Sequence, residues 1–134
     1  MSPHSLWDFA ANYTAAWCSQ DPARVAACFS DSGSLTVNDD EPAVGRAAIE
    51  QVARSFMEAF PDLHLVMDEL ELQAHHPVYR WTLTGTHGEN GRPVNISGYE
   101  VWTIGDDGLI EVSRGHFDAD DYARQLGGDA QTSA

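Results

Sequence analysis

A chain of 134 residues is long enough for one hydrophobic core and too short for two. Its formal charge of −14 comes from 21 acidic and 7 basic residues, and every basic residue is an arginine. The absence of lysine excludes chemistry that needs a Schiff-base or P-loop lysine. The negative field argues against a nucleic acid or an anionic membrane as partner.

The chain has no obvious segment for crossing or passing a membrane. No apolar run approaches the roughly 20 residues that span a bilayer, and the first eight residues lack the basic start and apolar stretch of a secretory signal. Cys18 and Cys28 are too few for a disulfide scaffold or a four-thiolate zinc site. We therefore expect two reduced, buried thiols in helical segments, and a cytoplasmic location.

The N-terminal half predicts three helices and one short strand. Apolar residues at three- and four-residue spacing predict a first amphipathic helix of about four turns between Ser5 and Trp17. Asp21-Pro22 predicts the start of a short second helix. We expect Ser32-Gly33-Ser34 to end that helix, and a short strand to follow over residues 35–37. After a polar loop, Gly45 precedes a third helix that stops before Pro61.

After Pro61 the hydrophobic period changes to two, which predicts four strands joined by short turns. The first strand carries a bulge near Asp68, where the alternation slips. A short helix over 119–126 then precedes a flexible tail over 128–134. The expected strands are 63–72, 78–87, 93–104 and 109–117, with turns at 75–77, 88–91 and 106–108.

This order of elements predicts one domain over residues 1–127. Helices gathered at the N-terminal end and followed by meandering strands are typical of an α+β fold with an antiparallel sheet. One face of such a sheet holds the helices, and the other faces water or a partner. We expect the sheet to be strongly curved around the long helices.

Five short motifs in this order carry a resemblance to a known superfamily. They are Phe60-Pro61-Asp62-Leu63, Thr84-Gly85-Thr86-His87-Gly88, Asp107-Gly108-Leu109-Ile110, Phe117-Asp118 and Gln125-Leu126-Gly127. The chain resembles the SnoaL-like polyketide cyclase branch of the nuclear transport factor 2 and ketosteroid isomerase-like superfamily, from about Leu6 to Gly127. The resemblance implies a cone-shaped α+β barrel with a mainly antiparallel sheet. It implies no single chemistry, because this fold carries isomerases, cyclases, dehydratases, epoxide hydrolases and non-catalytic adaptors.

The resemblance to ketosteroid isomerase implies a first catalytic group, Tyr13, Asp39 and Glu100. In that relative an aspartate moves the proton, while a tyrosine and a protonated aspartate donate hydrogen bonds to the enolate. Tyr13 and Glu100 match the two donors, and Asp39 matches the base, with Asn38 and Asp40 as alternatives. The alternative is that none of the three is catalytic. Tyr13 is then a core residue whose hydroxyl has a hydrogen-bond partner, Asp39 belongs to a solvated loop, and Glu100 lies on a solvent-exposed face of the sheet.

The SnoaL-like relatives imply a second group, His87 and Asp118. These relatives resemble acid–base enzymes that deprotonate a carbon between carbonyls and close a ring by an aldol step, without metal or cofactor. His87 continues the apolar face of its strand, so it is either an inward proton carrier or a satisfied core histidine. Asp118 is either catalytic or the N-cap of the last helix. Gly115 stands where some relatives carry a carboxylate, which argues against an epoxide hydrolase.

We expect an isomerase or polyketide-cyclase-like enzyme that acts on a small hydrophobic carbonyl compound by proton abstraction and enolate stabilisation. An ionised carboxylate or His87 would take the proton, and Tyr13 and a neutral Glu100 would donate hydrogen bonds to the enolate. We expect no metal or other cofactor, because no histidine or carboxylate pair has metal-ligand spacing on a helix. Five aromatic residues would supply the apolar walls: Trp17, Phe56, Trp81, Trp102 and Phe117.

Two other functions compete with this hypothesis. The protein is alternatively a non-catalytic ligand-binding or dimerisation module of the same fold, or an adaptor that binds another protein through its acidic surface. An enzyme predicts a cavity with at least one carboxylate of raised pKa, whereas a filled core predicts none. We expect a homodimer for the enzyme and the binding module, because a half-open sheet leaves apolar area to cover.

Overall fold

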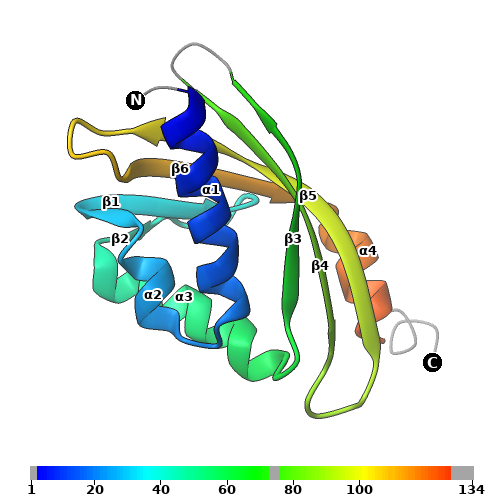
Figure 1. Ribbon diagram of the computed structural model, residues 1–134. Helices are drawn as coiled ribbons and strands as arrows, with labels where there is room; N and C mark the ends of the chain where they lie inside the picture. Colours follow the sequence, from blue (N-terminus) through cyan, green and yellow to red (C-terminus); the bar gives the residue numbers. More distant parts are fainter. Residues whose placement is uncertain (1–2, 73–75, 128–134) are drawn as a thin grey trace.

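The computed structural model describes residues 3–72 and 76–127, and within these ranges the chain forms four helices and six strands (Figure 1). The turn expected at 75–77 therefore lies partly outside the described residues, and the expected tail lies wholly outside them. The helices are α1 (Pro3–Cys18), α2 (Pro22–Ala26), α3 (Arg46–Ala59) and α4 (Ala119–Gln125). The strands are β1 (Phe29–Val37), β2 (Ala43–Val44), β3 (His64–Glu71), β4 (Val78–Thr86), β5 (Pro93–Ile104) and β6 (Ile110–Phe117).

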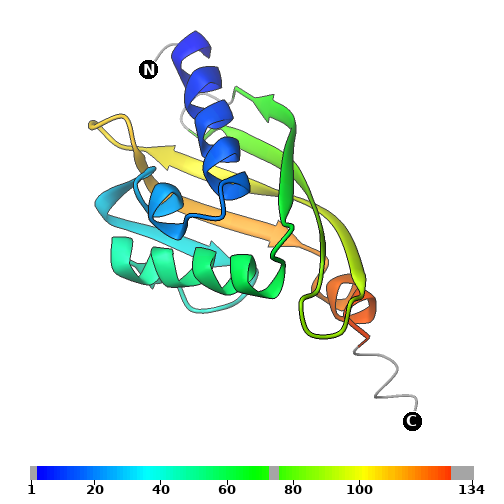
Figure 2. The ribbon, with the colours of Figure 1, turned by 60° about the horizontal axis from the view of Figure 1, so that its bottom comes forward.

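The strands form one sheet in the order β2-β1-β6-β5-β4-β3. All neighbours are antiparallel except β1 and β6, which are parallel. The sheet bends so strongly that β3 and β4 run across the direction of β1 and β6, and α1, α2 and α3 lie together on its inner side (Figures 1 and 2). The sheet ends in β2 and β3 and does not close on itself. The predicted α+β fold with a curved, mainly antiparallel sheet is confirmed.

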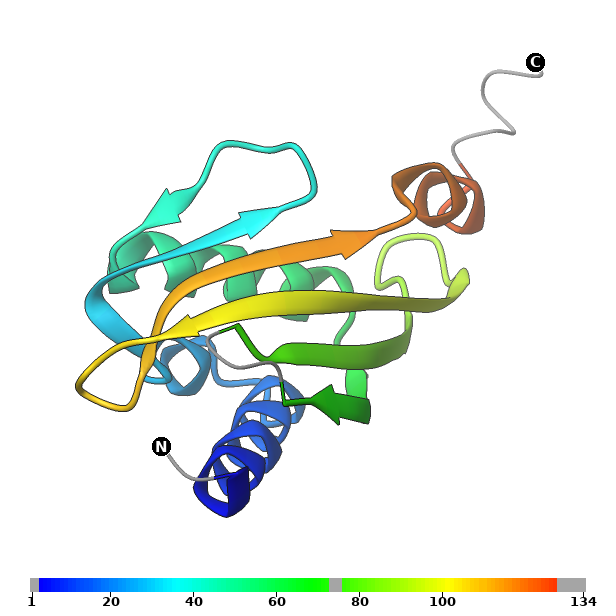
Figure 3. The same cartoon turned by 90° about the horizontal axis from the view of Figure 1, so that it is seen from above.

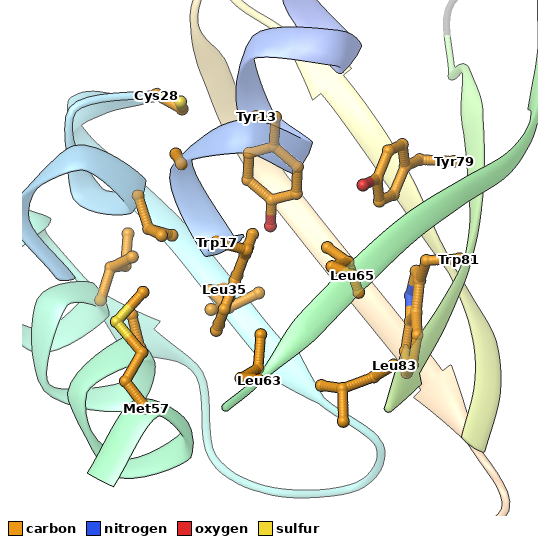
Figure 4. Packing of buried hydrophobic residues seen from close by; sticks show 14 of the residues in the cluster. Tyr13, Trp17, Cys28, Leu35, Met57, Leu63, Leu65, Tyr79, Trp81 and Leu83 are labelled. Atoms are coloured by element: carbon orange, nitrogen blue, oxygen red, sulfur yellow. The ribbon is translucent and has the colours of Figure 1, made fainter. Parts of the chain in front are cut away.

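The helices begin and end close to the expected residues, because local signals determine their limits. The carboxylate of Asp21 accepts a hydrogen bond from the backbone N–H of Ala23 at 3.1 Å and caps α2, as its position before Pro22 predicts. Gly45 precedes α3 with φ at 90°, a conformation that favours glycine. Figure 4 shows how side chains from α1, α3 and the inner face of the sheet meet in one core.

The region between α2 and α3 differs from the prediction. Ser32-Gly33-Ser34 does not end a helix but lies inside β1, where the pairing with β6 shifts register between Phe29 and Ser34. A Cβ at position 33 would lie 2.9 Å from the carbonyl oxygen of Ile110, so this glycine permits a close approach of two strands. The two-residue strand β2 was not expected, and it lies between the expected polar loop over 38–42 and Gly45. In β3, by contrast, the predicted bulge at Asp68 is confirmed, since pairing shifts between Met67 and Glu69.

The two cysteines are free thiols at the ends of the first two helices. Cys18 is the last residue of α1 and is half-buried, whereas Cys28 is buried. Cys28 lies in the turn after α2, not in a helix as expected. Burial raises the pKa of the Cys28 thiol to about 11, so this side chain remains protonated and acts as a small apolar group.

Candidate functional site

The most unusual group in the interior is the carboxyl group of Glu100. Residues of β5 alternate between the two faces of the sheet, so Ile96, Gly98, Glu100 and Trp102 all point toward the helices. Glu100 is only 8% exposed, although ionisable side chains are almost never so deeply buried unless they have partners. A carboxyl group at this depth therefore needs hydrogen bonds from its surroundings.

Three donors from different elements converge on one oxygen of this carboxyl group. The Tyr13 hydroxyl of α1 donates to Oε1 at 2.8 Å. The Ser113 hydroxyl of β6 donates to the same oxygen at 2.7 Å, and the Trp102 indole N–H donates at 3.0 Å. Among the described residues, none donates a hydrogen bond to the other oxygen, Oε2. Because a carboxylate oxygen has about two lone pairs, three donors saturate Oε1, and a proton bound by Glu100 resides on Oε2.

Burial and hydrogen bonding shift the pKa values of both Glu100 and Tyr13. Burial raises the pKa of Glu100 above its ordinary value, and the bonds from Trp102, Ser113 and Tyr13 offset part of this effect. Burial, together with the nearby charge of Glu100, raises the pKa of Tyr13 well above its ordinary value. Tyr13 thus stays protonated and keeps donating to Glu100, while Glu100 gains a proton more readily than an exposed glutamate.

Glu100 faces a cavity of about 60 Å³ between the sheet and α3, several times the roughly 10–15 Å³ that one water needs. The lining side chains from α3 and from the ends of β1 and β6 are only half-buried. Glu100 is the one ionisable residue among its lining residues. The others are Trp17, Leu35, Val37, Val52, Phe56, Leu65, Trp81, Leu83, Ile96, Gly115 and Phe117. Such an apolar lining with one polar group is typical of a small-molecule site.

The structure brings together two of the five expected catalytic residues. Glu100 lines the cavity, but Tyr13 is fully buried behind it and does not line the cavity itself. Of the five expected wall residues, four line the cavity with Glu100. The exception is Trp102, which is fully buried, stacks on Tyr79 with ring centroids 4.9 Å apart, and donates to Glu100.

The other three expected catalytic residues do not line this cavity. Asp39 is exposed in the loop after β1, and Asp118 caps α4 by accepting a hydrogen bond from the Asp121 N–H at 3.0 Å. Both border a second hollow, which shares Trp81 and Phe117 with the cavity and also includes Tyr99 and His116 of the outer face. His87 follows the last residue of β4 and packs edge-on against Phe60, with centroids 5.6 Å apart. The α4 helix lies near the end of β6, beside the loop between β4 and β5 (Figure 3).

Ser113 is the functional side chain whose role the sequence does not reveal. The alternation of β6 places Ser113, Gly115 and Phe117 on one face, and the structure shows that this face is the inner one. Ser113 pairs with Trp102 and Gly115 pairs with Glu100, so the serine stands diagonally beside the glutamate. A buried serine on the strand next to a buried glutamate is the pattern that would have pointed to Ser113 as a hydrogen-bond donor to Glu100.

Two further properties concern the described part of the chain only. Within residues 3–72 and 76–127, no three His, Cys, Asp or Glu side chains lie close enough to hold a metal ion. Over the same ranges, no helix combines the length and apolar character that crossing a membrane requires.

Comparison with solved structures shows extensive similarity of fold. A protein with a ketosteroid isomerase-like fold from Catenulispora acidiphila, in complex with trimethylamine, has a TM-score of 0.80 and 13% identity, with 95% of each chain covered. TsrD from Streptomyces laurentii has a TM-score of 0.83 and 21% identity, covering 96% of this chain and 98% of TsrD. The epoxide hydrolase/cyclase-like enzyme SalBIII, which functions in pyran ring formation in polyether salinomycin, has a TM-score of 0.75 and 18% identity, with coverage of 86% and 92%.

Sequence comparison gives a more specific result. No curated protein matches the chain. The family model described as the SnoaL-like domain matches residues 10–112. This match runs from the middle of α1 to the start of β6 and includes Tyr13 and Glu100. The chain therefore belongs to the SnoaL-like domain family.

Proposed function

We propose that this protein is a small-molecule acid–base enzyme in which Glu100 moves a proton on a hydrophobic carbonyl compound. One observation carries the proposal: a buried carboxyl group has Oε1 saturated by three donors and Oε2 without a donor, at the wall of an apolar cavity. The donors hold the carboxyl group in one orientation, so its reactive oxygen is positioned before a ligand arrives.

The chemistry follows from the protonation of Oε2. An ionised Glu100 takes a proton from the carbon next to a carbonyl group, and the resulting neutral Glu100 returns it to another carbon of the enolate. This exchange needs a group whose pKa lies closer to the working pH than that of an ordinary carboxyl group. Burial moves the pKa of Glu100 in that direction. The apolar lining would favour a substrate with little polar surface beyond its carbonyl group.

This mechanism assigns the expected residues to different roles. Glu100 becomes the proton carrier instead of a donor to the enolate. Tyr13 acts through Glu100, because its hydroxyl is bonded to Oε1 and does not line the cavity. Asp39, His87 and Asp118 lie outside the cavity, so the mechanism gives them no part in the proton transfer.

Hydrogen–deuterium exchange at the methyl group of acetophenone tests the proposal. Proton NMR in D₂O measures how fast the protein exchanges the α-protons of this simple apolar ketone. We expect the wild-type protein to accelerate the exchange and Glu100→Gln to lose about 100-fold, since a general base contributes roughly 10²–10⁴-fold. Glu58→Gln makes the same chemical change at an exposed position of α3 and should exchange like the wild type. Equal rates for Glu100→Gln and the wild type would refute the proposal.

A second function, ligand binding without catalysis, has one observation in its favour. Glu100 is the single ionisable residue that lines the cavity. A reaction that needs one protein group as acid and another as base therefore lacks its second group there. The structural relative from Catenulispora acidiphila holds a small organic amine, which supports a small ligand for this fold. Acetophenone that binds to the wild-type protein without faster α-proton exchange would favour this second function.

We also propose that the outer face of the sheet pairs with a second copy of the chain. Val66 on this face is 44% exposed, and Tyr99 and Val101 are half-buried. An open sheet face with apolar side chains is stabilised when a partner covers it. Size-exclusion chromatography with light scattering should give twice the mass of one chain at micromolar concentration. Replacing Val66 with Asp should shift the protein toward the monomer, and a monomeric wild type would contradict the proposal.

A further inference from the structure

The proposed proton transfer, on which this inference rests, leaves one requirement unmet. When a base removes a proton next to a carbonyl group, negative charge develops on the carbonyl oxygen, which then needs a hydrogen-bond donor. Tyr13, Trp102 and Ser113 all donate to Glu100 Oε1. A donor for the substrate oxygen must therefore come from another residue of the cavity.

Two tryptophans of the cavity have indole groups without a hydrogen-bond partner. Among the described residues, the buried side-chain nitrogen and oxygen atoms that lack a partner are Nε1 of Trp17 and Nε1 of Trp81. Both tryptophans line the cavity, at 7% exposure each. Buried donors without an acceptor are rare in folded proteins, and they call for a physical explanation.

The two indoles differ in their nearest acceptor. The Trp17 indole lies close enough to the Tyr13 hydroxyl to lower the pKa of Tyr13, against the larger effects of burial and Glu100. A small shift of Trp17 would give its N–H an acceptor within the protein. For Trp81 no described contact supplies an acceptor, so its N–H is the donor that a ligand would satisfy.

The position of the Trp81 ring is tightly determined. Trp81 pairs with Gly98 across β4 and β5, and a Cβ at position 98 would lie 2.7 Å from Cζ2 of the indole. The ring also packs edge-on against Phe117, with centroids 6.0 Å apart. Figure 4 shows the indole nearly edge-on, with its nitrogen on the side of Leu65 and Leu83, which also line the cavity.

Trp81 and Glu100 are diagonal neighbours on the inner face of the sheet, and both line the cavity. Glu100 lies two residues along β5 from Gly98, the partner of Trp81. Diagonal neighbours of this kind on one sheet face are about 7–8 Å apart. This spacing lets the side chains of Trp81 and Glu100 reach the same ligand in the cavity that both of them line.

We propose that the Trp81 N–H donates a hydrogen bond to the carbonyl oxygen of the substrate while Glu100 Oε2 faces the adjacent carbon. Oε2 then takes the proton, the C–H electrons form the C=C bond of the enolate, and the carbonyl π electrons move to the oxygen held by Trp81. Return of the proton to carbon restores Glu100. The substrate class is a small, largely apolar ketone. Its oxygen reaches the covered nitrogen when apolar side chains of the cavity move aside.

Indole ¹⁵N–¹H NMR with acetophenone and ethylbenzene tests this assignment. The two molecules have similar shape, but only the ketone has an acceptor. The chain has four tryptophans, so their indole signals can be assigned by single Trp→Phe variants. We expect acetophenone to move the proton signal of Trp81 downfield and ethylbenzene to leave it in place. Trp81→Phe should weaken acetophenone binding about fivefold, the effect of one ordinary hydrogen bond, and leave ethylbenzene binding unchanged.

Trp17→Phe is the matched control, because it removes the other unpartnered indole from the same cavity. It should keep the preference for the ketone. The inference is overturned if the Trp17 signal responds in place of the Trp81 signal, if Trp81→Phe keeps the preference, or if the wild-type protein binds the ketone no better than ethylbenzene. If one variant fails to fold, the other three still assign its signal by elimination, so the wild-type NMR shifts decide the question. Exchange of α-protons in Glu100→Gln tests the proposed function separately.

Discussion

Replacing Gly98 with alanine should destabilise the protein and displace the wall of the cavity. A methyl group at this position would overlap the carbonyl oxygen of His116, and it would lie 2.7 Å from Trp81 Cζ2 and 3.0 Å from Phe117 Cβ. The first of these atoms belongs to the backbone of the neighbouring strand and cannot move without disturbing the pairing of β5 with β6. Overpacking of this kind costs about 1–3 kcal/mol, and we expect the upper half of that range.

Gly115 provides the matched control on the neighbouring strand. A Cβ there would lie 3.5 Å from Glu100 Cγ and 3.5 Å from the Thr36 carbonyl oxygen, which are ordinary contacts. Because glycine inside a strand is less favourable than alanine by about 0.5–1 kcal/mol, Gly115→Ala should be neutral or slightly stabilising.

Urea unfolding followed by tryptophan fluorescence measures both effects. Gly98→Ala should lower the free energy of unfolding by about 2 kcal/mol after the gain from removing a glycine is subtracted, whereas Gly115→Ala should not lower it. Gly98→Ala should also change the NMR signal of the Trp81 indole. Equal stability of the two variants would refute the contact argument, and with it the placement of Trp81 against the backbone of β5.

Three further variants test the environment of Glu100 and one helix cap. Because burial raises the pKa of Glu100, the folded state keeps its proton to higher pH than the unfolded state, so stability falls as pH rises between the two pKa values. Glu100→Gln should remove this loss, and superimposable urea midpoints of variant and wild type from pH 4 to 8 would contradict it. Tyr13→Phe removes a hydrogen-bond donor, so it should raise the pKa of Glu100 in a carbon-13 carboxyl titration. It should also lower the free energy of unfolding by about 1.5–3 kcal/mol at pH values where Glu100 is ionised. An unchanged titration would argue against the hydrogen bond between Tyr13 and Glu100. Asp118→Ala should cost about 1 kcal/mol through loss of the α4 cap and leave acetophenone exchange unchanged, whereas lost exchange would return Asp118 to the catalytic group.

Much of the fold follows from local patterns, because helices and turns depend on neighbouring residues. The caps at Asp21 and Asp118, the end of α3 before Pro61 and the bulge at Asp68 all lie where short-range signals place them. The segment of β1 that contains Gly33 does not follow such a pattern. Its extended conformation depends on pairing with β6, which lies about 80 residues away in the chain. From the sequence alone, serine and glycine in this segment are equally compatible with the end of a helix.

The sequence by itself determined which side chains share a sheet face, because the alternation of a strand is a local property. It thus placed Glu100 on one face with Gly98 and Trp102, and Trp81 on one face with Leu83, but it left open whether the face of Glu100 is buried. Only the tertiary structure decided what these residues contact. The bond between Tyr13 and Glu100 joins positions 87 residues apart, and the packing of α1 against the curved sheet turns the tyrosine toward the carboxyl oxygen instead of the cavity. The same packing leaves Asp39, His87 and Asp118 outside the cavity, because the position of a side chain depends on how whole helices and strands pack together.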